Sequence, residues 1–414
     1  MSNTKGTSAI VPPQGGGAQS GLGEKFSPDL FTGTGNFSVP IAVPPGRNGF
    51  QPELTLGYSS GNGNGTFGLG WALGIPGITR KTSRGIPVYS DSQDVFILSG
   101  AEDLVPVAST HSTSSGSNPI GHEKTTYRPR TEGLFARIIH HKKSNGENYW
   151  EVRSKDGLIS FYDTPDLEDN DPCVIANPEN RKAIFGWCLS KTVDPYGNEI
   201  IYEYERDLVS TSSTTAPHKY DQLYLSSIKY AQYMDEGEKK YLCEVKFNYE
   251  ERPDPFSSYR QGFEMRTTRR CVNIETYTHA DETRKTKTYH FNYLSGNKMP
   301  LNGVSMLKSV SVEGHPSTSS GTSGEESEWM PPLEFGYSKF NPSRRGLRNI
   351  KGPIPMMMLS QPGYELADLN GNGLPDLLQL DGVARYWTNK GDGTFSNPRM
   401  LELAPTVQLG QPGV

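Results

Sequence analysis

The sequence predicts an all-β fold, and three features of the 414-residue chain support this prediction. Its 45 glycines and 31 prolines interrupt the chain often, as the many turns of an all-β protein require. Short apolar runs alternate with polar residues, and helical periodicity is scarce. The hydrophobic content is only 34%, but 21 tyrosines, 16 phenylalanines and 5 tryptophans supply large surfaces that sheet layers can bury.

The N-terminal part predicts a loose segment followed by strands. Residues 1–27 are polar and rich in glycine, so we expect a flexible N-terminal arm there. The alternation of Leu54, Leu56 and Tyr58 indicates a half-buried strand, and Val88–Leu98 is expected to form another pair of strands.

Hairpin turns are the clearest local signals in the middle of the chain. Within LFARIIHHKKSNGENYWEVRSKDGLISFYD, turns at Asn145-Gly146 and Asp156-Gly157 separate three strands, and a third turn is expected from Asp194 to Asn198. Two later strands carry alternating residues on one face: Val245, Phe247 and Tyr249, and then Tyr289, Phe291 and Tyr293. We expect at least ten strands and no long helix.

Composition also predicts loops and a domain boundary. Two Ser/Gly-rich stretches, at about residues 109–122 and 313–331, are expected to be flexible because they cannot bury a core. The main boundary is expected between residues 350 and 360, which gives domains at 28–350 and 360–414.

Charge, cysteines and hydropathy exclude several classes of protein. The net charge is −5 without a large block of one sign, unlike a nucleic-acid-binding surface. The four cysteines lack C-x-x-C spacing, so we expect scattered reduced thiols rather than a zinc site or a disulfide framework. The N-terminus has no apolar core of signal-peptide length, and no window approaches the ~20 apolar residues of a membrane span.

A formal G-x-G-x-x-G pattern occurs at Gly63, Gly65 and Gly68. A phosphate site of this type needs a helix after the glycines, but Gly74 and Pro76 interrupt the segment that follows. We therefore expect a glycine-rich turn that lets strands approach closely.

Two short patterns are similar to the catalytic signature of ADP-ribosyltransferases. They are Ser317-Thr318-Ser319 and the pair Glu326 and Glu328. Both lie in one Ser/Gly-rich tract, so no sheet can be built between them. A solvated linker is the expected structure.

The adjacent histidines His140 and His141 lie on a predicted strand. Neighbouring strand residues face opposite sides, so the two side chains are not expected to bind one metal. Carboxylates are dispersed, and the spacing supports no Ser/His/Asp or Cys/His arrangement. We therefore predict no catalytic residues and no enzyme activity.

The stretch DLNGNGLPD, from Asp368 to Asp376, has oxygen-bearing side chains at its first, third, fifth and ninth positions. It is not an EF-hand, because the twelfth position is Gln379 and the flanking segments are strand-like. The candidates for a weak calcium site are the side chains of Asp368, Asn370, Asn372 and Asp376 and the backbone carbonyl of Leu374. A metal-free turn capped by the same side chains is an equally open alternative.

The segment ELADLNGNGLPDLLQLDGVARYWTNKGDGTFS resembles an FG-GAP/VCBS repeat of integrin-like β-propellers. The shared pattern covers Asp368–Leu377, Trp387, Asn389, Gly391–Gly393 and Phe395. The resemblance implies one blade of an incomplete propeller at residues 360–414. Because one blade cannot bury its faces alone, we expect this chain to be the N-terminal piece of a longer protein or a truncated product.

Four other segments together resemble the SpvB N-terminal domain. They are PGRNGFQPELTLGYSSGNGNGTFGLGWAL, RKTSRGIPVYSDSQDVFILSGAEDLVP, YRPRTEGLFARI and NYEERPDPFSSYRQGFEMRTTRRC. An SpvB-type domain followed by such a blade resembles the B component of insecticidal toxin complexes (TcB), and related RHS proteins share its hairpin style. The fold class implied is an all-β, extended multi-hairpin β-sheet shell of SpvB/RHS type, followed by the start of a β-propeller.

This resemblance implies a non-enzymatic structural role. The expected partners are an RHS-repeat C component that carries the toxic enzyme and a pore-forming A component. The protein is expected to be assembled in the cytoplasm and secreted without a recognisable signal peptide. Two alternatives are a fragment of an SpvB-type ADP-ribosyltransferase effector and an integrin-like surface adhesion protein.

Overall fold

The computed structural model describes residues 22–28, 34–99, 102–112, 122–131, 133, 135–143, 147–163, 173–210, 217–316, 327–338, 346 and 349–402. Within these ranges the only helices are two short 3-10 turns, η1 (Arg47–Gly49) and η2 (Gly296–Lys298), so the all-β prediction is confirmed. The chain divides into two compact units. The first consists mostly of residues 38–57 and 62–336, and the second mostly of residues 337–414.

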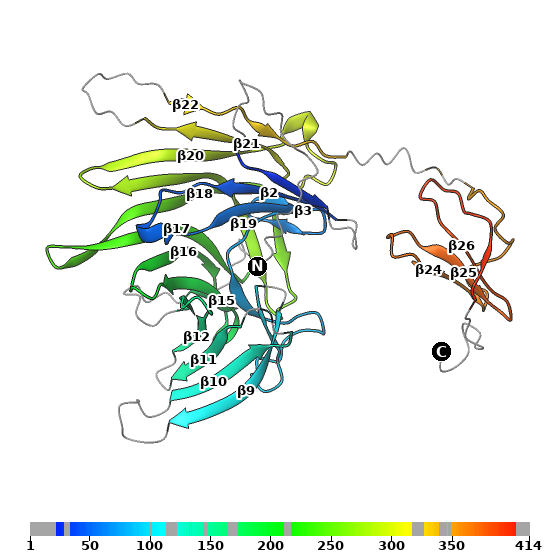
Figure 1. The fold of residues 1–414 in the computed structure, drawn as a ribbon, viewed down its shortest axis with the longest axis horizontal. Coiled ribbons are helices and arrows are strands. Elements are labelled where there is room, and N and C mark those ends of the chain that lie inside the picture. Colours follow the sequence, from blue (N-terminus) through cyan, green and yellow to red (C-terminus); the bar gives the residue numbers. More distant parts are fainter. Residues whose placement is uncertain are drawn as a thin grey trace, which may run out of the picture. The chain divides into compact units, whose positions relative to one another are not determined.

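The strands are numbered in chain order, as labelled in Figure 1. The early strands are β1 (Lys25–Pro28), β2 (Gly35–Ile41), β3 (Leu54–Ser59), β4 (Asn64–Gly65), β5 (Gly68–Leu69), β6 (Trp71–Leu73), β7 (Gly77–Arg80), β8 (Phe96–Leu98) and β9 (Glu102–Ser112). The middle strands are β10 (His122–Pro129), β11 (Arg137–Lys143), β12 (Asn148–Arg153), β13 (Ile159–Tyr162), β14 (Val174–Asn177), β15 (Asn180–Val193), β16 (Glu199–Val209) and β17 (Tyr220–Asp235). The late strands are β18 (Glu238–Ser258), β19 (Met265–His279), β20 (Thr283–Tyr293), β21 (Leu307–Gly314), β22 (Glu328–Trp329), β23 (Leu333–Glu334), β24 (Tyr364–Ala367), β25 (Asp376–Leu380), β26 (Ala384–Trp387) and β27 (Arg399–Met400).

A closed barrel organises the first unit. Strands β7 to β13 pair with their neighbours in order, β13 pairs with β15, and β15 pairs back with β7. Buried aromatic side chains from five of these strands pack together inside the ring: Phe96, Tyr127, His140, Trp150 and Trp187. Aromatic packing of this kind supplies much buried area from few residues, which suits a chain of low hydrophobic content.

A sheet of long strands continues from β15 through β16, β17, β18, β19, β20 and β21, as Figure 1 shows. One face is apolar and fully buried at Ile228, Val245 and Ile274. The small sheet β1-β2-β3-β6 lies against this face, because the Ala42 amide donates to the Tyr289 hydroxyl at 2.8 Å and the Tyr230 hydroxyl donates to the Pro44 carbonyl at 2.6 Å.

The alternation predicted for these strands is confirmed. Val245 and Phe247 are buried on β18, and Tyr289 and Phe291 are buried on β20, while Lys246 between the first pair is exposed. Period-2 burial of this kind places every second side chain of the long-strand sheet on its other face.

The glycine-rich segment forms a tight hairpin, β4–β5, as predicted. Gly68 has φ +87°, and a Cβ there would lie 2.7 Å from the backbone oxygen of Ser305. The hairpin is docked because Leu69 donates its amide to Ser305 at 2.9 Å. No helix follows the glycines, so the dinucleotide-binding alternative does not apply.

A side chain at a bulge in β18 binds the same hairpin. The β18–β19 register shifts between Glu251 and Phe256. This places the buried Arg252 guanidinium where it donates to the Gly65 carbonyl at 3.0 Å and to the Asn64 side-chain oxygen at 2.9 Å.

The prediction of two strands over Val88–Leu98 is wrong, because only Phe96–Leu98 forms a strand, β8. The rest of that segment is held as a loop by its own side chains. The Asp91 and Asp94 carboxylates both accept hydrogen bonds from the buried Arg80 guanidinium at 2.7 Å. Tyr89 in the same loop has φ 61°, which no extended strand allows.

The sheet also extends into segments predicted to be loops. Ser109–Ser112 belongs to β9, β21 runs to Gly314, and β22 lies at Glu328–Trp329. Hydrogen bonds to neighbouring strands stabilise the extended backbone there, although the composition is typical of a loop. Residues 113–121 and 317–326 lie outside the described residues.

Two further predictions fall at the edges of the described ranges. Lys25–Pro28 is strand β1, which shortens the predicted N-terminal arm, and residues 1–21 are not described. The predicted turns at Asp156-Gly157 and Asp194–Asn198 are confirmed, the second by an Asp194–Asn198 backbone hydrogen bond of 3.0 Å. The Asn145-Gly146 turn lies outside the described residues.

The second unit contains a four-stranded antiparallel sheet in the order β24-β25-β26-β27. Its core is Leu377, Trp387 and Phe395, and the Trp387 indole donates to the Pro353 carbonyl at 2.8 Å. A sheet of four strands is the size of one propeller blade. The propeller and the domain limits 28–350 and 360–414 stay predictions.

The docking of the glycine hairpin can be tested with two matched substitutions. Gly68→Ala and Gly237→Ala both place a side chain at φ +87°, but nothing lies within 4 Å of a Cβ at Gly237. We expect Gly237→Ala to cost about 1 kcal/mol of unfolding free energy, and Gly68→Ala to cost roughly 2 kcal/mol more because Ser305 must move. Urea denaturation of the 414-residue chain measures both; equal losses would contradict the close docking.

Candidate functional site

The predicted calcium loop is a tightly hydrogen-bonded turn between β24 and β25. Both carboxylate oxygens of Asp368 accept backbone amides, from Asn372 at 3.1 Å and from Gly373 at 2.8 Å. The side-chain oxygen of Asn372 accepts the Leu374 amide at 2.9 Å. These backbone donors, Gly373 first, lower the pKa of Asp368.

The other end of the loop is anchored by Asp376, which is fully buried. Its two carboxylate oxygens accept the Asn370 side-chain amide and the Asn389 backbone amide, each at 2.8 Å. Gly371 and Gly373 have φ of 64° and 77°, so the loop needs glycine at both positions.

The hydrogen bonds of the loop oxygens determine how the loop could bind a cation. The side-chain oxygens of Asp368, Asn372 and Asp376 already accept hydrogen bonds within the protein. An oxygen that accepts one hydrogen bond keeps a second lone pair for a cation, so these bonds order the loop without excluding calcium. Only Asp368 and Asp376 carry a full charge, which would make a calcium site here weak. The calcium assignment to Asp368, Asn370, Asn372, Leu374 and Asp376 stays a prediction.

The two adjacent histidines face opposite sides of β11, as expected. His140 stacks on Trp150 inside the barrel, with ring centroids 4.1 Å apart. His141 stacks on Tyr149 at 4.6 Å and lies 3.3 Å from the Glu151 carboxylate. Within the described residues, no group of three or more His, Cys, Asp or Glu side chains could hold a metal ion.

A cluster of charged side chains contacts the aromatic core of the barrel. The Arg80 guanidinium lies 4.8 Å from the centre of the Phe96 ring and pairs with Asp91 and Asp94. The His140 side chain lies 3.6 Å from Asp91 and donates a 2.6 Å hydrogen bond from Nε2 to the side-chain oxygen of Asn148. Burial lowers the pKa of His140 to about 4, so this histidine is neutral at pH 7.

All four cysteines are free thiols. Cys173, Cys243 and Cys271 are buried, and burial raises the pKa of Cys188 to about 12. Protonated, enclosed thiols are poor nucleophiles and poor metal ligands. Of the two short patterns similar to the ADP-ribosyltransferase signature, only Glu328 lies in the described residues, exposed on β22.

The structure assembles one arrangement that the sequence did not reveal. The His279 ring contacts the Thr283 hydroxyl at 2.9 Å and the Glu244 carboxylate at 3.0 Å. Thr283 and His279 are paired across the β19–β20 hairpin, and Glu244 comes from β18. A threonine exposed at a hairpin end lacks the desolvated, oxyanion-binding surroundings of a catalytic nucleophile.

These residues belong to a larger charged surface, which we call the ladder face. It is the face of the long-strand sheet opposite the apolar one, and it comprises Glu203, Lys229, Glu244, Lys246, Asn248, Asn273, Glu275, Tyr277, His279, Thr283, Lys285, His290 and Glu313. Sequence reasoning missed it because the pairing partners lie on different strands. The signal within each strand is the alternation itself, as in YLCEVKFNYE.

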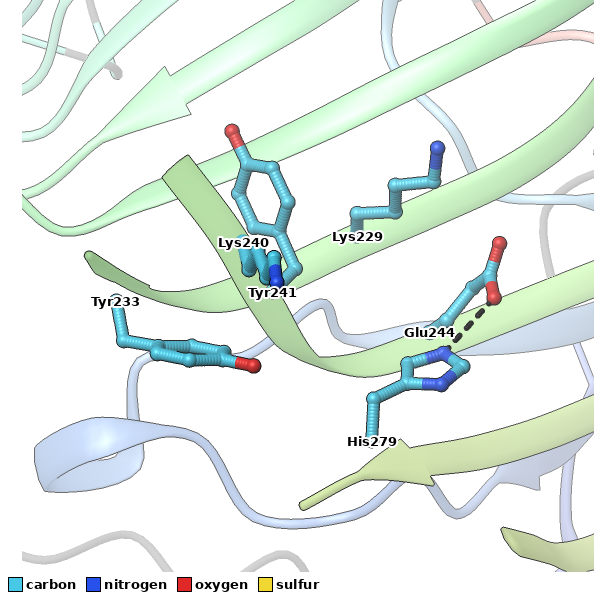
Figure 2. A pocket seen from close by; sticks show the side chains of 6 residues that line it. All are labelled: Lys229, Tyr233, Lys240, Tyr241, Glu244 and His279. Atoms are coloured by element: carbon cyan, nitrogen blue, oxygen red, sulfur yellow. Dashed lines mark hydrogen bonds and ion pairs between the residues drawn. The ribbon is translucent and has the colours of Figure 1, made fainter. Parts of the chain in front are cut away.

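A shallow hollow of about 290 Å³ lies in the ladder face (Figure 2). Its lining comes from three neighbouring strands: Lys229 and Tyr233 from β17, Lys240, Tyr241 and Glu244 from β18, and His279 from β19. Burial, followed by the nearby Glu199 and Glu203 carboxylates, raises the pKa of Tyr241 to about 12. The hollow therefore presents neutral phenols beside paired charges.

Comparison with known proteins identifies the family. The model of the family described as Salmonella virulence plasmid 65kDa B protein (SpvB) matches residues 30–252 and 233–280. This chain belongs to the SpvB family. The SpvB resemblance expected from the sequence is thereby confirmed, and the propeller blade stays a prediction.

Curated relatives of this SpvB-family chain are ADP-ribosyltransferases by name. The "Mono(ADP-ribosyl)transferase SpvB" of Salmonella typhimurium is 29% identical over 313 residues, which cover 64% of this chain and 50% of the relative. The protein of the same name from Salmonella dublin matches equally. The chain therefore spans about half the length of the curated relatives it matches.

Solved structures share the fold of this SpvB-family chain. The N-terminal domain of effector protein SpvB from Salmonella typhimurium strain LT2 matches with a TM-score of 0.57 at 24% identity, over 67% of this chain and 99% of that one. A chain of the TcdB2-TccC3 crystal structure matches with a TM-score of 0.67 at 24% identity, over 99% of this chain and 21% of that one. A chain of the Photorhabdus luminescens Tc holotoxin pore gives 0.70 at 24%, over 98% and 20%. The predicted all-β fold of extended sheets is confirmed, and its propeller part stays a prediction.

Acid should destabilise the barrel of the SpvB-family domain through His140. Between pH 6.5 and about 4 the unfolded chain binds a proton that the folded chain excludes, so the free energy of unfolding falls as the pH falls. The loss should approach roughly 3 kcal/mol by pH 4. His140→Gln should flatten this pH dependence. Urea denaturation at several pH values tests this; an unchanged slope in His140→Gln would assign the proton to another group.

Calcium should bind the Asp368 loop weakly, with a dissociation constant of about 0.1–1 mM. Asp368→Asn keeps one oxygen, which can accept either the Asn372 or the Gly373 amide, and removes the charge. It should abolish calcium binding and lower the free energy of unfolding by about 1 kcal/mol for the lost acceptor. Isothermal titration of the parent and the variant measures this. Absence of binding in the parent at millimolar calcium would establish the metal-free turn.

Proposed function

We propose that this SpvB-family chain is a non-enzymatic structural component of a toxin-delivery complex. In this role its first unit forms part of a hollow β-shell that encloses a toxic enzyme. The second unit leads into a propeller that gates the shell and docks onto a translocation pore.

The share of this chain that each solved structure matches is the observation that supports this proposal. The TcdB2-TccC3 chain matches 99% of this chain, whereas the SpvB N-terminal domain matches 67%. The match to the toxin-complex chain therefore covers both compact units. The match to the SpvB domain covers a stretch about as long as the first unit. The long hairpins of β17 to β20 also suit a wall that has one packed face and one wetted face.

An open apolar groove supports the propeller part of the proposal. The groove has a volume of about 580 Å³ and is lined by residues of the second unit alone, among them Ile354, Met357, Leu366, Leu377 and Phe395. A blade of a propeller buries such a face against its neighbour. We propose that the following blade of the full-length protein covers it.

The proposed partners follow from the same architecture. An RHS-repeat C component would complete the shell and supply the toxic enzyme, and a pore-forming A component would receive the propeller. The complex would assemble in the cytoplasm and act outside its cell. The described residues include no helix with the length and apolarity of a membrane span.

Assembly is the first test. The full-length protein should co-elute with the RHS-repeat protein of its source organism when the two are co-expressed and separated by size-exclusion chromatography. Shell formation requires many strand pairings, so we expect the complex to survive dilution and high salt. Separate elution of two monomers would contradict the proposal.

The second test addresses the transferase alternative, which the name of the Salmonella relatives favours. Incubation of the 414-residue chain with labelled NAD and host-cell extract should transfer no label, with Salmonella typhimurium SpvB as the positive control. Label on an acceptor protein would favour an ADP-ribosyltransferase. Specific binding on a glycan array would instead favour an adhesion protein.

A further inference from the structure

Cys173 and Cys188 lie opposite each other on neighbouring strands. The β14–β15 register pairs Val174 with Trp187, so the residue before the first is opposite the residue after the second. The Cys188 amide donates to the Cys173 carbonyl at 2.8 Å, which joins the two backbones directly. Opposite residues of a hydrogen-bonded antiparallel pair have Cα atoms about 5.5 Å apart. This spacing lies within the range of about 4.4–6.8 Å that a disulfide bond spans.

The two thiols also project toward one place in the fold. Directly opposite residues of an antiparallel pair share one face of the sheet. Burial, followed by the thiols of Cys188 and Cys173, raises the pKa of Tyr204 well above its usual value. Both thiols therefore lie near the same phenol, whose hydroxyl donates to the Leu189 carbonyl at 2.9 Å. Position and direction together bring the two sulfurs within reach of each other.

The cysteine pair lies where the hydrogen-bond ladder along β15 is incomplete. Both β13 and β14 pair with β15, and β13 ends at Tyr162, opposite Leu189. The Cys173 amide donates to the Asp163 side chain at 2.8 Å, and the Asp163 amide donates to the Cys188 carbonyl at 3.1 Å. A regular pair would instead exchange two backbone bonds between the cysteines. A covalent bond at this position would join strands that the ladder joins only in part.

Cys188 is the member of the pair that a reagent can reach first. It is partly exposed, whereas Cys173 is buried. Burial raises the pKa of Cys188 to about 12, and the nearby Arg206 guanidinium offsets only part of this effect. The thiolate is therefore a small fraction at pH 7, so the thiol reacts slowly and only in sustained oxidising surroundings.

We propose that Cys173 and Cys188 are the site of a reversible disulfide bond, formed by exchange with a small disulfide such as glutathione disulfide. The Cys188 thiolate attacks one sulfur of glutathione disulfide and releases one glutathione. The Cys173 thiol then displaces the second glutathione and closes the bond within the chain. Two protein thiols are oxidised, one glutathione disulfide is reduced, and the two thiol protons end on the two released glutathiones. The inference is independent of the proposed function.

Peptide mapping without reduction tests this site. The folded 414-residue chain is incubated with excess glutathione disulfide at pH 8, blocked with N-ethylmaleimide and digested with trypsin. The cleavage sites place Cys173 in peptide 156–181 and Cys188 in peptide 183–191. We expect mass spectrometry to find these two peptides joined, and excess reduced glutathione to separate them again.

The other cysteines provide matched controls. Cys243 and Cys271 lie on β18 and β19, but neither is opposite a cysteine in the β18–β19 register, so they should stay reduced. Cys188→Ser should abolish the joined peptides, and Cys243→Ser should leave their formation unchanged. Between pH 7 and pH 8 the rate in the parent should rise about tenfold, because the thiolate fraction of a group with a pKa near 12 rises by that factor.

Stability measurements show whether the bond fits the native fold. Oxidation should move the midpoint of urea denaturation upward in the parent and leave it unchanged in Cys173→Ser. A parent that keeps both thiols reduced at pH 8, or that joins Cys188 to Cys243 or Cys271, would overturn the proposal. So would a cross-link that forms only after the chain is unfolded in urea, or one that moves the midpoint downward.

Discussion

The pairing of β15 with β7 is the interaction on which the first unit depends. Three of its residues, Gly186, Trp187 and Cys188, pair with β7 and so return the chain to the strand that began the ring. Later residues of the same strand pair with β13 on one side and with β16 on the other. One strand therefore belongs both to a closed barrel and to the long-strand sheet. Gly186 suits this crossing, because a Cβ there would already lie 3.2 Å from the Thr79 side chain.

Buried arginines compensate for the low hydrophobic content at the junctions between these parts. Arg80 ties the loop after β7 to the barrel, Arg206 pairs with the fully buried Asp221, and Arg252 joins the β18 bulge to the glycine hairpin. Asp221 also accepts the Ala176 amide at 2.9 Å, which connects β14 to β17. Such pairs specify geometry more than they add stability, since an unpaired partner left in the interior is strongly unfavourable. The aromatic core then supplies the buried area.

Local patterns in the sequence predicted the features that depend on neighbouring residues, which are the buried strand faces and the hairpin turns. Alternation predicted the buried faces of β18 and β20, and turn residues predicted the hairpins at Asp156-Gly157 and Asp194–Asn198. Barrel closure was not predictable, because nothing in the sequence near Gly77 indicates pairing with Gly186–Cys188. The loop at Asp91 and Asp94 was mistaken for strand for the same reason: its partner, Arg80, is identified only by the fold. The Asp368 loop was located by its motif, but its hydrogen bonds with Asn389 come from a later strand connection.

The fold does not depend on disulfide bonds, because its four cysteines are free thiols. None is cross-linked, and Cys188, Cys243 and Cys271 lie on strands, where burial raises the pKa of their thiols. A chain built this way can fold in a reducing compartment, because no covalent cross-link has to form before its strands are in place. Its stability there comes from packing and hydrogen bonds alone.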